Sequence, residues 1–423
     1  MNAPTSAQSR KAVTAAVIGN VLEWYDFAVY AYVAGIIARK FFPTQDEVTA
    51  LLATFLAFGL GFVARPVGGI VIGRLGDTRG RKAALLLTIY LMAAGTVLIG
   101  VLPTYSTIGF LAPLLLVVAR LMQGFSAGGE WGSSTSFIVE WAPKGKRGLF
   151  GSFQQTSVVG GLLLGSGFAA LMNTVLAPAD MESWGWRVPF LVGGLLGPVG
   201  IYMRRNMEET PAYATVSTKP QAPVTAGPGG LSLAARAFGF TIVWTVCFYV
   251  LLNYMPTWTQ KYMKLTAAQA LWSNTIGLLV LMVAIPVMGH LSDRYGRKPL
   301  LLACCVGFIA LPYPLFTYLN SGSVPLVMLI VIQILFALMI SMFSGAGPAA
   351  IAEIFPTHSR STWMTSGYAL AVAIFGGFAP YISVWLIDRF GSPTVHTYYL
   401  IAAAVVSTAV IWALKETAFE DLA

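Results

Sequence analysis

The chain is a succession of long apolar stretches separated by short polar segments. Each stretch is long enough to cross the roughly 30 Å hydrocarbon core of a bilayer as an α-helix rising about 1.5 Å per residue. The pattern therefore predicts an all-α membrane protein with twelve transmembrane helices. The predicted spans are approximately 12–38, 50–73, 83–102, 111–138, 149–175, 188–205, 236–258, 270–291, 299–319, 324–345, 362–387 and 395–414.

One long polar gap, residues 206–235, divides the predicted helices into two groups of six. Its composition is typical of a linker, because it is rich in helix-breaking residues. These are Pro211, Pro220, Pro223, Pro228, Gly229 and Gly230. We therefore predict a tail over 1–11, an N-terminal half over 12–205, a linker over 206–235, a C-terminal half over 236–414 and a second tail over 415–423.

The composition supports a membrane location. Hydrophobic residues make up 57% of the chain and charged residues 10%, against about 45–50% and about 25% in soluble domains. These values exclude a soluble globular enzyme, a disordered chain and a coiled coil. The net charge of +9 comes from basic residues between apolar runs, so membrane topology explains it better than nucleic-acid binding.

The distribution of basic residues predicts the orientation in the membrane. With both termini inside, Lys and Arg are about three times as frequent in the inner segments as in the outer ones. This bias predicts two cytoplasmic termini in a membrane of the bacterial inner type.

The sequence contains no pattern of catalytic or metal-binding residues. The three cysteines lie in apolar stretches and the three histidines are scattered, so neither a disulfide framework nor a metal site is predicted. The spacing of a nucleotide-binding glycine loop is absent as well. We expect no metal, no cofactor and no enzymatic activity.

Two pairs of polar loops repeat between the halves. Residues 73–82 read Gly-Arg-Leu-Gly-Asp-Thr-Arg-Gly-Arg-Lys, and residues 289–298, at an offset of 216, read Gly-His-Leu-Ser-Asp-Arg-Tyr-Gly-Arg-Lys. Residues 140–147 and 353–360 repeat a Glu, a Pro and an Arg at an offset of 213. Two near-equal offsets predict parallel halves related by an axis along the membrane normal.

The repeated loops carry charges that can hold the halves together on the cytoplasmic side. An acid there can pair with an arginine or with the N-terminus of a neighbouring helix. The predicted cytoplasmic gate comprises Asp77, Arg81, Asp293, Arg297, Glu140, Arg147, Glu353 and Arg360. The alternative interpretation is a solvated basic turn that only sets the topology.

With these loops the chain resembles the major facilitator superfamily, in which the G-x-L-x-D-x-x-G-R-K loop occurs twice. The run Arg120-Leu121-Met122-Gln123-Gly124 resembles a second signature of that fold. Segments 19–27, 62–66, 123–130 and 184–190 are similar to the metabolite:H⁺ symporter family. The resemblance covers nearly the whole chain, and it implies a monomer that transports citrate, 2-oxoglutarate, shikimate, or proline and betaine.

Ionisable residues deep inside the predicted spans all belong to the N-terminal half. They are Glu23, Asp26, Arg65, Arg120 and Glu130. Each costs several kcal/mol unless it is paired or hydrated, so each is a candidate functional residue. Helix depth predicts one pair, Asp26 with Arg120, nearer the outer side and a second pair, Glu130 with Arg65, nearer the cytoplasm. A static ion-pair network is the structural alternative.

These charges suggest how protons are coupled to transport. Burial disfavours the charged form of a carboxylic acid, so at least one of the three acids is expected to take up a proton near neutral pH. Protonation would free an arginine for a substrate carboxylate, and deprotonation would restore the internal pair. In sugar porters of the same superfamily an acid in span 1 and the arginine of the span 4 motif occupy these places. The resemblance therefore ranks Asp26 first as proton carrier, then Glu23, then Glu130.

Further polar and aromatic residues are expected to line the substrate cavity. Isolated amides are costly on membrane helices unless they have a partner or face water, and Pro256 is expected to kink span 7. The predicted substrate-binding residues are Arg120, Arg65, Tyr30, Gln154, Gln155, Asn253, Tyr254 and Trp258. For the aromatic residues, ordinary packing is the alternative.

Together these features predict proton-coupled symport of a small organic carboxylate, a di- or tricarboxylate such as citrate, by alternating access. The two buried arginines and the resemblance favour that substrate. An alternative is a zwitterion such as proline or betaine, whose cationic nitrogen would suit the aromatic residues. A drug/proton antiporter is a further interpretation. The expected partners are protons, a small-molecule substrate and the lipid bilayer, and no nucleic acid.

Overall fold

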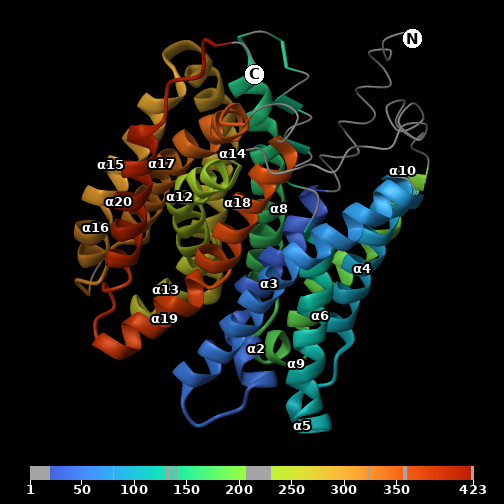
Figure 1. Cartoon of the computed structure of the whole chain (residues 1–423). Helices are drawn as coiled ribbons and strands as arrows, with labels where there is room; N and C mark the ends of the chain where they lie inside the picture. Colours follow the sequence, from blue (N-terminus) through green and yellow to red (C-terminus); the bar gives the residue numbers. More distant parts are fainter. Residues whose placement is uncertain are drawn as a thin grey trace.

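In the computed structural model, all regular secondary structure of the described residues is helical (Figure 1). The described residues are 20–79, 81–128, 131, 134–135, 138–139, 142–143, 145–205, 230–322, 324–355 and 360–420. Each of the twelve predicted spans contains a described helix, which confirms the all-α prediction. Six described helices are long and apolar enough to cross a membrane, or eight if each of two bent pairs forms one span.

The described part of the N-terminal half begins with a helix, Asn20–Tyr32, that bends by 64° into α2. The helices that follow run in chain order to the start of the predicted linker. They are α2 (Ala34–Phe41), α3 (Glu47–Arg79), α4 (Arg81–Val101), α5 (Tyr105–Ile108), α6 (Leu111–Ala127), α8 (Arg147–Val175), α9 (Pro178–Ser183), the 3-10 helix η1 (Gly185–Arg187) and α10 (Val188–Arg205).

The C-terminal half contains two π-helical segments, η2 and η3, inside spans 7 and 11. Its elements are α12 (Gly230–Phe248), η2 (Tyr249–Tyr254), α13 (Met255–Tyr262), α14 (Ala267–Tyr295), α15 (Arg297–Ala310), α16 (Pro312–Leu319), α17 (Leu326–Glu353), α18 (Arg360–Ala371), η3 (Val372–Gly376), α19 (Ala379–Phe390) and α20 (Thr397–Ala413). Because α12 begins at Gly230, residues 230–235 of the predicted linker are helical.

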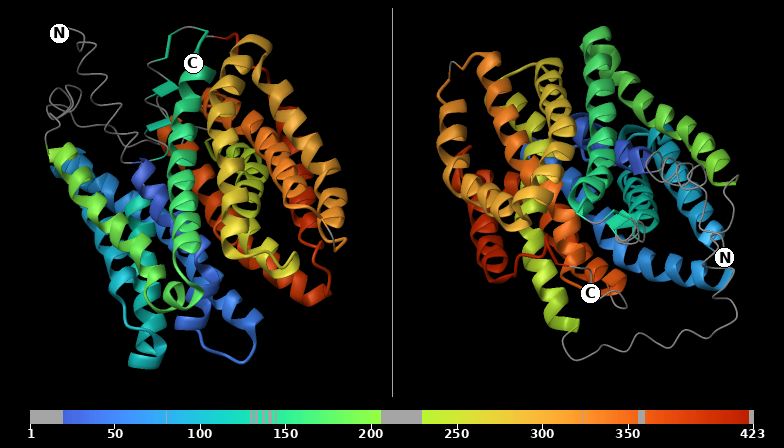
Figure 2. Two further views of the ribbon diagram at one scale, coloured as in Figure 1. Left: turned by 180° about the vertical axis from the view of Figure 1, so that it is seen from behind. Right: turned by 90° about the horizontal axis from the view of Figure 1, so that it is seen from above.

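The two halves lie side by side and meet along a long seam (Figures 1 and 2). Helix α8 of the N-terminal half packs along α14 and α17 of the C-terminal half. Helix α3 contacts η3 and α19 on another part of the seam. In Figure 1 the end that carries α5 and α9 is at the bottom, and we call it the lower end and the opposite one the upper end. The basic-residue bias predicts that the upper end faces the cytoplasm.

Glycines bring α3 and α6 into unusually close contact. A Cβ atom placed on Gly124 would lie 1.6 Å from the carbonyl oxygen of Gly61, and one on Gly68 would lie 1.9 Å from that of Phe125. No side chain fits at such distances, so the two backbones touch directly, as small residues allow between membrane helices. This contact positions Arg65 on α3 and Arg120 on α6 on the same side of the N-terminal half.

A second glycine contact joins α8 to the first helix and gives a matched pair of variants. A Cβ on Gly161 would lie 2.5 Å from the carbonyl oxygen of Val21, whereas one on Gly160 would meet its nearest atom at an ordinary 3.6 Å. We expect Gly161→Ala to cost about 1–3 kcal/mol through overpacking and Gly160→Ala to be neutral. Thermal unfolding midpoints of the purified variants would check this, and equal midpoints would contradict the packing seen here.

Candidate functional site

The site is built around the first helix, which presents Glu23 and Asp26 one turn apart. Arg65 approaches from α3 and Arg120 from α6, and all four side chains are buried. Glu130, the remaining candidate proton carrier, lies outside the described residues. The sequence-predicted acids and bases that are described are therefore gathered in one region of the N-terminal half.

Arg120 is fully buried among aromatic rings. Its guanidinium carbon lies 4.8 Å from the ring centroid of Phe27, 4.5 Å from that of Tyr30 and 5.0 Å from that of Phe58. Its Nη1 atom donates a 2.8 Å hydrogen bond to Oε1 of Gln123. Neither Nε nor Nη2 has a hydrogen-bond partner among the residues that the structure describes. A buried cation with two free donors is costly and is suited to receive an anion.

Arg65, like Arg120, lies against the ring of Phe27. Its guanidinium carbon lies 4.7 Å from the Phe27 ring and 4.4 Å from the Phe62 ring. Its Nη2 atom is 3.9 Å from Oε1 of Glu23, well beyond the about 2.7–2.9 Å of a charge-assisted hydrogen bond. Within the described part of the chain, Nε and Nη2 of Arg65 have no hydrogen-bond partner. The loose pair leaves this arginine also able to contact a ligand.

Among the described residues, Asp26 and Arg120, the pair expected from helix depth, form no direct hydrogen bond or ion pair, although their charges interact. The Asp26 carboxylate instead accepts a 2.6 Å hydrogen bond from the hydroxyl of Thr96 on α4. That hydroxyl in turn accepts a 2.8 Å hydrogen bond from Nε2 of Gln123. Depth along a helix gives height but not direction around the axis. The two charges are linked through Thr96 on α4 and through Gln123, which lies on the same helix as Arg120.

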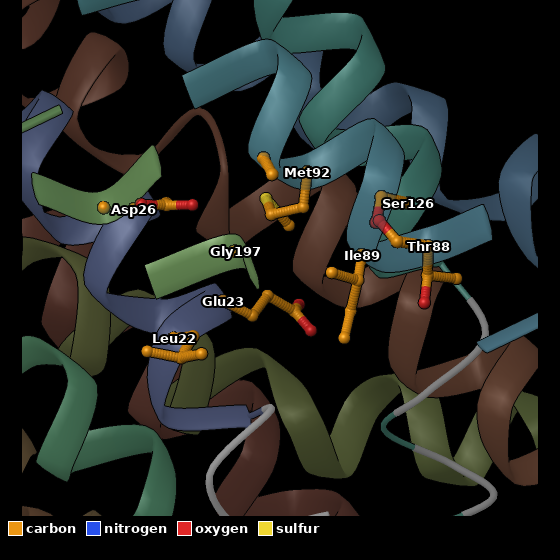
Figure 3. A pocket seen from close by; sticks show the side chains of 10 residues that line it. Leu22, Glu23, Asp26, Thr88, Ile89, Met92, Ser126 and Gly197 are labelled. Atoms are coloured by element: carbon orange, nitrogen blue, oxygen red, sulfur yellow. The ribbon is translucent and has the colours of Figure 1, made fainter. Parts of the chain in front are cut away.

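A small cavity of about 40 Å³ lies beside the two acids (Figure 3). Its wall includes Glu23 and Asp26 from the first helix and Thr88 from α4, and Figure 3 shows the Glu23 carboxylate extending into it. One water needs roughly 10–15 Å³ of such space, so the cavity has room for water between the carboxylates. On α10, Gly193 allows the close approach to Asp26, since a Cβ there would lie 2.4 Å from Oδ1.

Aromatic side chains from both halves form a wall next to the arginines. The ring of Tyr249 lies 5.2 Å from that of Phe62 and 6.3 Å from that of Trp24, and Phe248 lies 5.9 Å from Trp24. Tyr249 starts the π-helix η2, and its hydroxyl has no hydrogen-bond partner among the described residues. π-helical segments often mark functional positions, and here one places a tyrosine where the halves meet.

Pro256, where a kink is expected, lacks the N–H group that other residues have. An α-helix would bond that group to the carbonyl oxygen of Leu252, four residues earlier. In the structure this oxygen accepts 3.1 Å and 3.3 Å hydrogen bonds from the Tyr32 hydroxyl and the Asn274 amide. Tyr32 belongs to the N-terminal half, so the proline creates an acceptor for a contact between the halves.

The remaining predicted binding residues are divided between this region and the packed interior. The Tyr30 ring lies against Arg120 while its hydroxyl donates to the Thr54 carbonyl. Gln155 donates to Gln154, whose own Nε2 is unpartnered within the described residues, as is Nδ2 of Asn253. The other two aromatic residues lie elsewhere: Tyr254 packs on Phe55 and His396, and Trp258 on Phe316 and His396.

Trp258 is not placed with the arginines. It is fully buried, and its indole N–H already donates a 2.8 Å hydrogen bond to the carbonyl of Pro393. Its ring packs on Tyr262 and Phe316 of the same half. The packing alternative given for this residue describes its surroundings better than a cavity-lining role.

Sequence reasoning missed three residues of the site. Gln123 stands three positions after Arg120, a helical spacing that could have paired them. Thr96 is one of two threonines in an apolar span, and nothing in the sequence distinguishes it from a threonine that bonds its own helix. The position of Tyr249 depends on the π-helical segment η2, which the hydrophobic pattern does not predict.

At the upper end, Asp293 joins the two halves. Its carboxylate accepts hydrogen bonds of 2.7 Å and 2.9 Å from the backbone N–H groups of Gly148 and Leu149, at the N-terminus of α8. It also accepts a 2.8 Å bond from Nη1 of Arg297. A carboxylate at a helix N-terminus satisfies free N–H groups and complements the helix dipole.

Glu353 forms a second connection beside the first. It accepts a 3.0 Å hydrogen bond from Arg147 of the N-terminal half, a 3.2 Å bond from Arg297 and a 2.6 Å bond from the Thr417 hydroxyl. Its side chain is 2% exposed, so water competes little with these contacts. Of the other predicted gate residues, Glu140 and the side chains of Asp77, Arg81 and Arg360 lie outside the described residues.

The segment after α20 folds against the same cluster. Glu416 accepts 2.9 Å hydrogen bonds from the backbone N–H groups of both Arg297 and Lys298 at the start of α15. Burial by itself would raise the pKa of Glu416, but these bonds and one from Ala418 outweigh it and lower the pKa. Arg147 also donates to the carbonyl oxygen of Glu420. The C-terminal segment therefore belongs to the contact between the halves.

Comparison with known proteins places this architecture. Residues 11–222 match the family described as Sugar (and other) transporter, and residues 262–422 match the Major Facilitator Superfamily. The chain is 34% identical to the glycine betaine/proline/ectoine/pipecolic acid transporter OusA of Dickeya dadantii (strain 3937), over 98% of this chain and 84% of that one. It is 36% identical to the citrate-proton symporter of Klebsiella pneumoniae, over 92% of this chain and 87% of that one.

A solved structure with the same fold is the xylose transporter XylE from E. coli in a partially occluded, inward-open conformation. The TM-score is 0.80 at 18% identity, and the match covers 97% of this chain and 99% of that one. The curated relatives are transporters, in agreement with the expectation that the chain is not an enzyme. The chain belongs to the major facilitator superfamily, and it is a multi-pass membrane transporter built from two helical halves.

Proposed function

We propose that the protein is a proton-coupled symporter of a small zwitterion of the proline or betaine type. The sequence alone favoured a di- or tricarboxylate such as citrate, whereas the geometry of the site favours the zwitterion. A zwitterion offers one carboxylate and one cationic nitrogen at short range. The site offers unpartnered guanidinium N–H groups next to aromatic rings and acids, and that juxtaposition is the observation that carries the proposal.

The substrate carboxylate would bind the free Nε and Nη2 atoms of Arg120, which no described residue occupies. The cationic nitrogen would lie against the wall formed by Trp24, Phe248 and Tyr249, where cation–π attraction replaces lost hydration. Glu23 and Asp26 add negative charge on the same side. Relatives named as betaine and proline transporters support this assignment.

An organic carboxylate such as citrate is the second candidate. Two arginines contact the ring of Phe27, so a substrate with two carboxylates could bind both of them. A relative named as a citrate-proton symporter supports this alternative. The two classes differ in what they require of the aromatic wall, because a carboxylate gains nothing from cation–π contact.

The first test uses purified protein in deenergised vesicles and records the external pH after substrate is added. We expect betaine or proline to cause alkalinisation and citrate or 2-oxoglutarate to cause none. Trp24→Leu should lower the affinity for betaine by about 5- to 30-fold, the equivalent of about 1–2 kcal/mol of cation–π energy. Trp412→Leu, which alters an exposed ring, is the matched control. A response to citrate alone, unchanged by Trp24→Leu, would establish the second candidate instead.

Orientation and assembly complete the proposal. We infer that the protein is a monomer in a bacterial-type inner membrane, with both termini and the cluster of Asp293, Arg297, Glu353 and Arg147 on the cytoplasmic side. The basic-residue bias supports the orientation. The cluster would then hold the cytoplasmic side closed in one state of the alternating-access cycle and separate in the other.

A further inference from the structure

We propose that Thr96 and Gln123 form a hydrogen-bond relay that transmits the protonation state of Asp26 to the substrate-binding face of Arg120. The inference rests on the proposed function, because it takes Asp26 as the proton carrier and Arg120 as a substrate contact. In this role Thr96 and Gln123 are positioning residues, which act through the two charged groups rather than on the substrate.

The relay has a single polarity from end to end. Arg120 donates to Gln123 over 2.8 Å, Gln123 donates to Thr96 over 2.8 Å, and Thr96 donates to Asp26 over 2.6 Å. A guanidinium can only donate and an ionised carboxylate can only accept. The two ends therefore fix the direction of each intermediate bond, including which side of the Gln123 amide faces Arg120.

The relay is enclosed, so water cannot readily replace a link. Thr96, Gln123 and Arg120 are each 0% exposed and Asp26 is 4% exposed. Gly95 beside Thr96 lets α6 approach, since a Cβ there would lie 2.9 Å from Cγ of Gln123. In a low-dielectric interior, each hydrogen bond strongly constrains its neighbours.

Protonation of Asp26 removes the constraint at one end. The neutral carboxyl group gains an O–H donor of its own, and the Thr96 hydroxyl no longer has to donate to it. Thr96 can then rotate and donate to the Gln123 carbonyl oxygen, which turns the amide over and withdraws the acceptor from Nη1 of Arg120. The guanidinium would then have Nη1 available to a substrate carboxylate in addition to Nε and Nη2. No bond changes except that between the proton and Asp26.

The surroundings of Asp26 leave few other groups to carry this signal. On its own helix Glu23 lines the same cavity and Tyr25 is the adjacent residue. Helix α4 contributes Thr96, Thr88 and Met92, and α10 contributes Gly193 and Gly197. From α6, Ser126 lines the cavity, and Arg120 reaches Asp26 through the relay.

The experiment measures substrate affinity by calorimetry as a function of pH. If uptake of one proton is linked to binding, the affinity of the wild type falls about tenfold per pH unit above the pH at which Asp26 titrates. We expect Thr96→Val, which keeps the shape and removes the hydroxyl, to bind substrate with less than a twofold change per pH unit. Thr96→Ser should restore the wild-type slope.

A second variant tests the relay independently, in case Thr96→Val does not fold. Gln123→Met keeps the length of the side chain and removes both links, so it should flatten the slope as Thr96→Val does. A wild-type slope in whichever of the two variants binds substrate would overturn the relay. If the wild type itself binds neither betaine, proline nor citrate, the proposed function fails and the relay fails with it. If the wild type binds with a linked proton and both variants keep its slope, only the relay fails.

Discussion

Asp26→Asn is expected to abolish uphill uptake driven by a pH gradient while leaving exchange of substrate across the membrane intact. Asparagine keeps the size of the side chain and can still accept the Thr96 hydrogen bond, but it cannot take up a proton. A gradient of two pH units is worth about 2.7 kcal/mol per proton, enough for about 100-fold accumulation in a coupled transporter. With the uncoupled variant, the substrate concentration inside the vesicles should rise only to the external concentration.

The two halves of this prediction are measured on the same vesicles, as accumulation under an imposed gradient and as exchange of labelled for unlabelled substrate. Asp388→Asn, at an exposed position on α19, is the matched control and should behave as wild type. Accumulation by Asp26→Asn at the wild-type level would mean that Glu23 or Glu130 carries the proton. Loss of both activities would show that Asp26 is needed for binding itself.

Arg147→Met is expected to shift the protein about 10- to 100-fold towards a state that is open at the upper end. Arg147 lies in the N-terminal half and bonds Glu353 and the Glu420 carbonyl of the other half. A hydrogen bond between charged groups contributes about 1.5–3 kcal/mol, and this one exists only while the halves are in contact. Glu353 keeps Arg297 and Thr417 as partners, so the substitution leaves no unpaired charge behind.

Distances between spin labels would report the shift directly. Phe153 on α8 and Tyr295 at the end of α14 are exposed and lie towards the upper end in opposite halves. The three native cysteines are buried, so labels attach at introduced sites. Arg39→Met removes an exposed ion pair with Glu182, which contributes little, and should leave the distances unchanged. An identical distribution in Arg147→Met would mean that other contacts close the upper end.

Much of the fold follows from the sequence because a membrane leaves few alternatives. Apolar runs in a bilayer must be helices, and the repeated loops at 73–82 and 289–298 show that the halves are copies. Pro256 indicated one irregularity in span 7. The hydrophobic pattern predicts neither the 64° bend after Tyr32 nor the π-helix that begins at Tyr249, because it records burial along the chain and not the path of the helix axis.

The site was predicted in its charges but not in its connections. The cost of a buried charge singles out Glu23, Asp26, Arg65 and Arg120 whatever the tertiary structure. Which of them are in contact depends on the rotation of each helix about its axis. Depth along a helix gives no information about that rotation. For the same reason the bond between Glu353 and Arg147, which are 206 residues apart, could not be predicted from spacing along the chain.

The stacked pair of Trp131 and Tyr368 gives the protein an intrinsic optical reporter. The two rings are 3.5 Å apart between centroids and nearly parallel, at 6°. They come from opposite halves and lie towards the upper end, so they separate whenever that end opens. Indole emission depends strongly on what the ring touches. A form that keeps Trp131 as its single fluorophore among the 11 tryptophans of the chain would show each opening event as a change in emission, without any attached label.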